Sequence, residues 1–232
     1  ITMAGLDVTE KAMVFPEDFE RIRALNNPVS TVVAEWLDFF YNFHRSLGYE
    51  GAPVHDAVAV AALVKPELMT IRELYIEIEL TGDYCRGATV ADWHNAKKRA
   101  PNIHCILDID RRGFVDLLVM ERGRRHMAKA PFLLDCDTGV DDAIAILLSK
   151  HLERLELVAV TSVAGNVECD KTTKNALRIL ELAGIDVPVY RGAEQPMFCE
   201  PVTAYYVHGQ NGLGDLDVPE PNGAGLLLAE RH

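Results

Sequence analysis

Four aspartates fall within eight consecutive positions near the middle of the chain, in the stretch Leu133-Leu134-Asp135-Cys136-Asp137-Thr138-Gly139-Val140-Asp141-Asp142. Carboxylates crowded in this way repel one another, so folding them together costs free energy unless a cation offsets the repulsion. A hard divalent cation is the simplest such partner, because it prefers oxygen ligands. The stretch therefore predicts a cation site.

The elements on either side of the cluster determine where these carboxylates point. Residues 131–135 form an apolar run typical of a buried parallel strand, and residues 140–152 then change to helical spacing. Ligands bind at the carboxyl ends of strands in open α/β sheets. An acidic first helical turn would explain Asp141 and Asp142, but it would not explain Asp135 and Asp137 on an apolar strand. The pattern therefore favours a functional site.

Three further segments carry polar residues where the chain is expected to turn. The segment 161–166, TSVAGN, ends an expected strand, and the segment 208–214, HGQNGLG, is a glycine-rich loop with one histidine. His55 and Asp56 precede a small apolar helix, which Asp56 would cap. Taken alone, the segment 161–166 is better explained as a turn, and the glycine-rich loop is weak evidence of a site. The pair of His55 and Asp56 is either a helix cap with an exposed histidine or a metal-binding carboxylate beside a proton donor.

The wider pattern predicts the fold class. Residues 155–163 and 187–190 read as buried strands, with a helix over 170–183 between them that ends at Gly184. The first part reads as helices over 16–25, 29–47, 56–64 and 114–120 and strands over 74–80 and 103–109. We expect an α/β fold with a mostly parallel open sheet flanked by helices and a Rossmann-like core.

Composition excludes some classes of partner. The 232 residues carry a net charge of -12, which argues against nucleic acid and against anionic membranes. We find no apolar stretch long enough to span a bilayer and no signal peptide. The five cysteines are scattered without a CxxC pair, which fits a reducing, cytoplasmic compartment.

Taken together, the segments resemble one family, the inosine-uridine-preferring nucleoside hydrolases. The resemblance rests on LLDCDTGVDDAIAILL, TSVAGN, KTTKNALRILELAG, the HGxxGLG loop and GAPVHDAVAVA, with GLDVT near residue 5 and YCRGATVAD near residue 84. It implies a nucleoside-hydrolase-like fold and calcium-dependent hydrolysis of the N-glycosidic bond of ribonucleosides, which releases free base and ribose in purine or pyrimidine salvage. The sequence does not fix the preferred base.

The resemblance also implies roles for the acidic residues. Asp137 and Asp142 match calcium ligands of the family, with Asp56 as a third carboxylate, and Asp135 would support the cluster. Asp137 would also act as the general base that takes a proton from water. Carboxylates and the hydroxyl groups of ribose together suit the oxygen ligands that calcium prefers.

The remaining matched residues would contact the substrate. Asp141 would hold ribose hydroxyls, and Asn166 would lie close to the sugar. His55 and His208 would lie near the departing base, and either could supply its proton at neutral pH.

The order of the parts departs from the family. Residues 131–232 resemble its N-terminal catalytic portion and residues 1–125 its C-terminal portion, with residues 126–130 as the junction and a central segment missing. We expect the parts to form one domain. The chain would then be a permuted and truncated form, an engineered chimera, or two pieces written in the wrong order. A missing segment would expose strand edges, so we expect a homo-oligomer.

Two other functions remain open at this point. A phosphohydrolase of the haloacid dehalogenase type also carries DxD after a strand, and Asp135 would be its nucleophile. The adjacent pair Asp141 and Asp142 fits that family poorly. A non-catalytic module that binds calcium or ribose is the other alternative.

Overall fold

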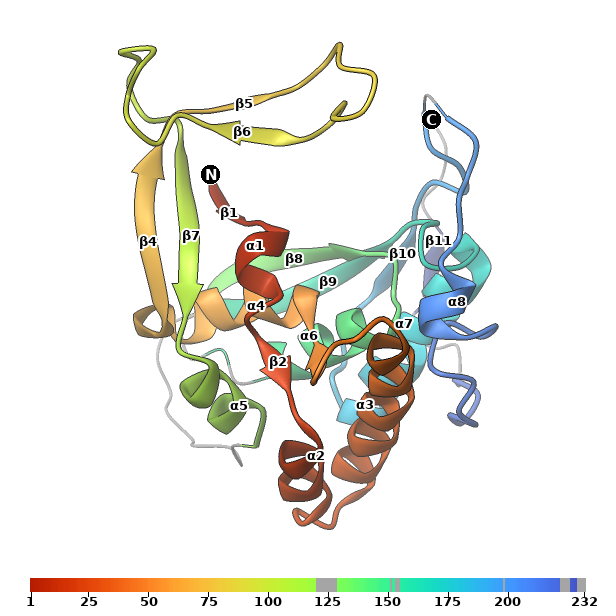
Figure 1. Cartoon of the computed structure of the whole chain (residues 1–232). Helices are drawn as coiled ribbons and strands as arrows, with labels where there is room; N and C mark the ends of the chain where they lie inside the picture. The colour runs from red at the N-terminus through yellow and green to blue at the C-terminus, as the bar shows by residue number, and fades with distance from the viewer. Residues whose placement is uncertain (120–128, 151, 153–154, 198, 222–225, 229–232) are drawn as a thin grey trace.

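A computed structural model describes residues 1–119, 129–150, 152, 155–197, 199–221 and 226–228. Its larger sheet is parallel throughout, and its strands follow the order β11-β10-β9-β8. The strands are β8 (Ala130–Cys136), β9 (Leu155–Ser162), β10 (Val189–Arg191) and β11 (Leu226–Leu228). The helices α6 (Val140–Ser149) and α7 (Cys169–Ala183) connect the first three strands (Figure 1). This arrangement confirms the predicted α/β class.

The first part of the chain builds a second, mixed sheet of order β1-β7-β4. The strand β7 (Ile103–Ile109) runs parallel to β1 (Thr2–Ala4) and antiparallel to β4 (Met69–Leu74). Two short antiparallel pairs accompany it, namely β2 (Met13–Val14) with β3 (Ala52–Pro53), and β5 (Ile76–Ile78) with β6 (Thr89–Ala91). The described residues therefore hold two larger sheets, whereas we predicted one.

In the view of Figure 1, the helices of the first part lie below and beside these strands. They are α1 (Leu6–Thr9), α2 (Pro16–Arg23), α3 (Pro28–Ser46), α4 (His55–Val64), a 3-10 turn (Pro66–Leu68) and α5 (Arg111–Val119). Local chemistry fixes the start of α3, since the Asn27 side chain accepts a hydrogen bond from Ser30 N at 2.9 Å. The segment between β10 and β11 contains α8 (Tyr205–His208).

The predicted strand over residues 74–80 is interrupted. Leu74 ends β4, and β5 begins at Ile76, where the Asn102 side chain pairs with the backbone N–H and carbonyl of Ile76. The alternation of Leu74, Ile76, Ile78 and Leu80 with polar residues predicts one buried face, but Ile78 and Leu80 are 58% and 70% exposed. The alternating pattern continued into a hairpin that extends beyond the core, as Figure 1 shows, so it did not mark a single half-buried strand.

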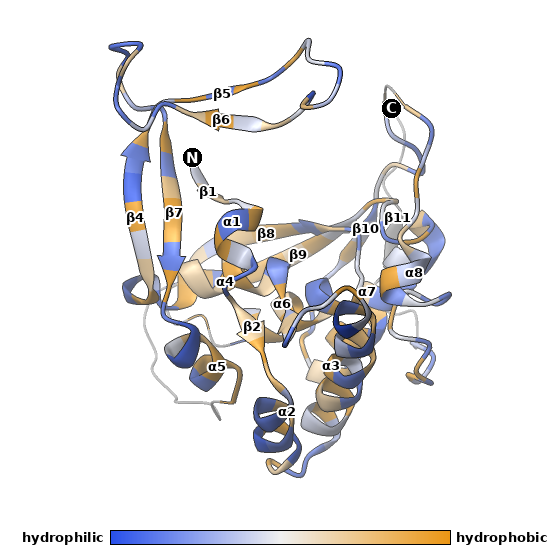
Figure 2. Cartoon of the chain, viewed as in Figure 1, coloured by the Kyte–Doolittle hydropathy of each residue, from blue (hydrophilic) through white to orange (hydrophobic). Residues whose placement is uncertain are grey.

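One hydrophobic core joins the two parts of the chain. It includes side chains under 2% exposed from four helices, namely Trp36, Phe114, Ile146 and Ile179. Figure 2 shows apolar residues along β8, β9 and α4, and mostly hydrophilic residues on α2. Most of the predicted junction, residues 126–128, lies outside the described residues. In the part of the chain that the structure describes, no helix is both long and apolar enough to cross a membrane.

Candidate functional site

The carboxyl end of β8 leads directly into the acidic start of α6. Gly139 is the last residue before the helix, and its N–H donates to Asp142 Oδ2 at 2.8 Å. This bond satisfies one of the free backbone donors at the helix start and fixes the Asp142 carboxylate. Asp141 and Asp142 are 5% and 3% exposed. The sequence therefore buries two adjacent carboxylates at a helix N-terminus.

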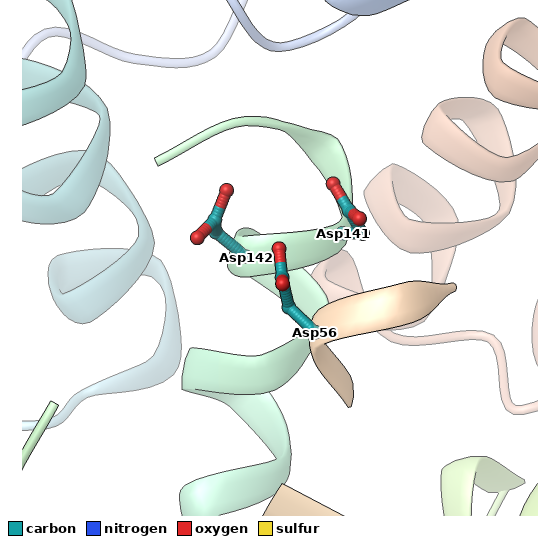
Figure 3. A group of neighbouring side chains, drawn as sticks. All are labelled: Asp56, Asp141 and Asp142. Carbon is teal, nitrogen blue, oxygen red and sulfur yellow. The ribbon is translucent and has the colours of Figure 1, made fainter. Parts of the chain in front are cut away.

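A third carboxylate reaches this point from the other part of the chain. We predicted that Asp56 caps its helix, and this was wrong, because α4 begins at His55 and the residue before it, Val54, has an apolar side chain. Asp56 lies in the first turn and joins Asp141 and Asp142, with one oxygen from each within 4.8 Å of the others. Figure 3 shows the three side chains beside one another at the starts of α4 and α6.

The group fits a hard divalent cation. Burial and then the Asp56 carboxylate hold the pKa values of Asp141 and Asp142 well above their usual range. Burial and then the Asp137 carboxylate raise the pKa of Asp56, which keeps contact with solvent. Asp141 Oδ1 is buried and accepts no hydrogen bond from any described residue. An unpaired buried oxygen is costly unless a bound ligand pairs with it, and crowded carboxylates are ligands that calcium and magnesium prefer.

This electrostatic arrangement predicts how calcium stabilisation depends on pH. The raised pKa values mean that the metal-free folded protein binds more protons than the unfolded chain above pH ~4, which makes it less stable as the pH rises. A calcium ion held by the ionised carboxylates would reverse this trend. We therefore expect the stabilisation by calcium, measured against chelator, to grow from about pH 5 to about pH 7.

Urea unfolding at several pH values, with calcium and with EGTA, measures this difference. The buried histidines have lowered pKa values and give a slope of opposite sign, but they do so in both series. The difference between the two series therefore isolates the contribution of the carboxylates to the pH dependence of stability. A stabilisation by calcium that is constant over this range would contradict the raised pKa values.

Asn166 links Asp137 to the group of three aspartates. Its backbone N–H donates to Asp137 Oδ2 at 2.7 Å, and its side-chain amide donates to Asp142 Oδ2 at 3.1 Å. Gly165 must be a glycine here, because a Cβ at that position would collide with the Asp137 carboxylate. Asp137 is half-buried, and its carboxylate lies near enough to the group to raise the pKa of Asp56. Asp135 is exposed on β8 and accepts from Thr161 Oγ1 at 2.5 Å.

Two histidines border the group, and their hydrogen bonds differ. His208, 5% exposed at the end of α8, accepts at Nδ1 from Val140 N–H at 3.2 Å. Burial lowers its pKa to about 4, so the ring is neutral at pH 7 and carries its proton on Nε2. His55 Nδ1 lies 2.9 Å from Thr9 Oγ1, and burial also lowers the His55 pKa. Sequence reasoning did not select Thr9 as a site residue, although this buried residue of α1 ends the matched segment GLDVT.

The close approach of these groups depends on Gly139. A Cβ at this position would lie 2.6 Å from both Asn166 Nδ2 and His208 Nδ1. Any larger residue would push one of them away from the aspartates. The structure thus brings together Asp56, Asp137, Asp141, Asp142, Asn166, His55 and His208 around the ends of α4, α6 and β8, with Asp135 on the preceding strand.

The sequence matches the model of a known protein family. The model of the family described as inosine-uridine preferring nucleoside hydrolase matches residues 1–116 and 132–231, which is most of the chain. The chain belongs to this nucleoside hydrolase family. The family resemblance predicted from the motifs is therefore confirmed.

Individual nucleoside hydrolases match shorter stretches. The pyrimidine-specific ribonucleoside hydrolases RihA of Salmonella newport (strain SL254) and Shigella flexneri are 50% and 51% identical to this chain over 120 residues. Each match covers 51% of this chain and 39% of the relative, so the chain spans about two fifths of the length of these curated relatives.

Solved nucleoside hydrolase structures match part of the chain as well. An inosine-guanosine nucleoside hydrolase is 36% identical over 41% of this chain and 29% of its own, with a TM-score of 0.37. A purine-preferring ribonucleoside hydrolase from Gardnerella vaginalis is 26% identical over 50% of this chain and 37% of its own, with a TM-score of 0.43.

Proposed function

We propose that this chain hydrolyses the N-glycosidic bond of ribonucleosides in a calcium-dependent reaction that releases free base and ribose. The observation that carries the proposal is the group of Asp56, Asp141 and Asp142, with a buried and unpaired oxygen on Asp141, in a member of a nucleoside hydrolase family. Uridine is the first substrate to test, because the RihA relatives are named pyrimidine-specific.

Asp56, Asp137 and Asp142 would hold the cation in this proposal. When bound, calcium supplies positive charge that lowers the pKa of water and attracts vicinal hydroxyl oxygens. An acidic residue of the chain then acts as the general base. Asp137 takes the proton from the attacking water, and the backbone N–H of Asn166 keeps the Asp137 carboxylate in place at 2.7 Å.

Asp141 recognises the ribose in this proposal. Asp141 Oδ1 accepts a hydrogen bond from a ribose hydroxyl, which satisfies the buried oxygen. Departure of the base leaves an oxocarbenium-like ribosyl centre, and the crowded carboxylates stabilise its positive charge. The same carboxylates that destabilise the metal-free protein therefore stabilise the transition state.

The hydrogen bonds of the two histidines suggest different duties. His208 uses Nδ1 as an acceptor from Val140, so protonation at Nδ1 would break that bond, and the ring serves as a neutral donor through Nε2. The Thr9 hydroxyl beside His55 can accept as well as donate, so His55 keeps a partner when doubly protonated. We assign proton donation to the leaving base to His55.

Recognition of ribose hydroxyls gives a direct test. Uridine should be hydrolysed at least about 1,000-fold more efficiently than 2′-deoxyuridine, because a site built to pair a hydroxyl discriminates strongly against its absence. Chromatography of released uracil, together with a reducing-sugar assay, gives kcat/KM for both. Equal values would show that Asp141 does not read the ribose.

A second candidate is binding of calcium and ribose without turnover. Two observations on β8, the strand that leads to the aspartates, favour this candidate. The strand lies at the edge of the described sheet, and its Leu133 is 64% exposed. Tight calcium and ribose binding by calorimetry, with no uracil released, would select this candidate over the first.

The exposed β8 edge also supports our proposal of a homo-oligomer, in which another strand covers it. A single monomeric species in sedimentation velocity would contradict this. The five cysteines are free thiols, and we propose a reducing, cytoplasmic compartment on that basis. Secretion of the natural protein with oxidised cysteines would overturn it.

A further inference from the structure

Helix α7 makes two hydrogen bonds to the loop that carries His208. This segment, residues 205–214, is here called the histidine loop. Lys171 Nζ donates to Gln210 O at 2.8 Å, and Asn175 Nδ2 donates to Asn211 O at 2.8 Å. Lys171 and Asn175 are four residues apart on α7, so they share one face of the helix. That face therefore supplies donors to two adjacent carbonyls of the loop.

The Asn175 amide also reaches the aspartate segment. Its Nδ2 lies 3.3 Å from Thr138 O, between β8 and α6, and the residue is fully buried. One side chain thus joins the backbone of the aspartate segment to the backbone of the histidine loop. Without it, the buried Thr138 carbonyl and the partly buried Asn211 carbonyl would lose a donor, and an unpaired buried polar group is destabilising.

The histidine loop is compact enough to transmit this restraint. The Asn211 side chain accepts from Leu213 N–H at 2.7 Å and from Asp215 N–H at 3.0 Å. Gly214 N–H in turn donates to His208 O at 2.8 Å, which closes the loop on the histidine itself. A displacement of residues 210–211 therefore displaces His208.

Lys171 restrains the beginning of the loop as well. Its ammonium group lies 3.1 Å from Glu168 Oε2 and 4.9 Å from the centre of the Tyr205 ring. The Tyr205 hydroxyl donates to Glu168, so the first residue of the loop is joined to the start of α7. Lys171 thus contacts the loop on both sides of His208.

We propose that Lys171 and Asn175 are positioning residues that hold His208 against the start of α6. They keep His208 Nδ1 at 3.2 Å from Val140 N and 3.9 Å from Asp141 Oδ1. This inference rests on the proposed function, because that function makes His208 a neutral hydrogen-bond donor in the site through Nε2. Neither residue touches the substrate in this account.

Lys171→Met tests the proposal with a matched control on the same helix. Lys174→Met removes an ammonium of similar exposure, 45% against 41%, whose partner is Glu220 beyond the loop. We expect Lys171→Met to speed amide hydrogen exchange at residues 209–214 about fivefold and Lys174→Met to leave it unchanged. Lys171→Arg keeps a donor of similar reach and should restore the parent rate.

Turnover provides a second readout. We expect Lys171→Met to lower kcat for uridine about tenfold, with calcium affinity within about twofold of the parent. Equal rates of amide hydrogen exchange in Lys171→Met and Lys174→Met would overturn the proposal. A loss of kcat in Lys171→Met that Lys171→Arg does not restore would also overturn it. Hydrogen exchange does not need an active enzyme, so a parent chain without turnover counts against the proposed function alone.

Asn175→Leu examines the buried bond. It should change the chemical shift of the His208 ring Cε1–Hε1 group in NMR spectra and leave the His104 signal in place. If this variant fails to fold, the Lys171 series decides the proposal. A folded Asn175→Leu protein with an unchanged His208 signal would contradict it.

Discussion

Replacing Asp142 by asparagine is expected to lower calcium affinity at least about 100-fold and to remove detectable nucleoside hydrolysis. Asp142 contributes a buried charge to the group with Asp56 and Asp141, and asparagine removes that charge. The asparagine oxygen can still accept from Gly139 N–H and from the Asn166 amide, as Asp142 Oδ2 does. The variant should therefore fold, and without calcium it should be more stable than the parent by about 1–2 kcal/mol.

Calorimetric titration with calcium and urea unfolding in EGTA measure these two effects. Asp186→Asn is the matched control, since Asp186 is exposed in the α7–β10 connection, at the opposite end of the sheet from the site. It should change neither quantity. Asp142→Asn with calcium affinity close to that of the parent would show that the cation does not bind at this group.

Replacing His55 by glutamine should lower kcat for uridine by about 100-fold to 10,000-fold, because a positioned acid contributes rate enhancement of this order. Hydrolysis of p-nitrophenyl riboside should fall far less, since p-nitrophenolate is stable as an anion and departs without a proton. The ratio of the two losses separates proton donation from general damage to the site.

His104→Gln provides the control for the histidine experiment, because His104 lies on β7 with a side chain 53% exposed. It should leave both substrates unaffected. Equal losses on the two substrates in His55→Gln would contradict the assignment of proton donation to His55. If His208→Gln instead shows the selective loss, the proton comes from the histidine loop.

Sequence periodicity predicted the second part of the chain well. The strand β8 with helix α6 is followed by the strand β9 with helix α7, and the apolar residues of the strands and helices differ in period. The end of α7 was equally readable, because Gly184 adopts φ 61°, a left-handed conformation that favours glycine. These features are local, so the residues that cause them are adjacent in the sequence.

Contacts between distant segments could not be read in the same way. Asp56 follows the pattern of a helix cap, and only packing of α4 against α6 turns its carboxylate toward Asp141. Thr9 and Asn175 lie in the motifs GLDVT and KTTKNALRILELAG, but these motifs do not show that the two side chains contact His55 and the histidine loop. Similarly, the alternation over residues 74–80 does not reveal that the hairpin beyond Ile76 leaves the core.

The most direct test of the account is a time course of uracil release from uridine by the folded protein, first with calcium and then with EGTA. The account predicts uracil and ribose in equal amounts with calcium, loss of release in EGTA, and recovery when calcium is restored in excess. Release at the same rate in EGTA, or no release from folded protein with calcium bound, would contradict it.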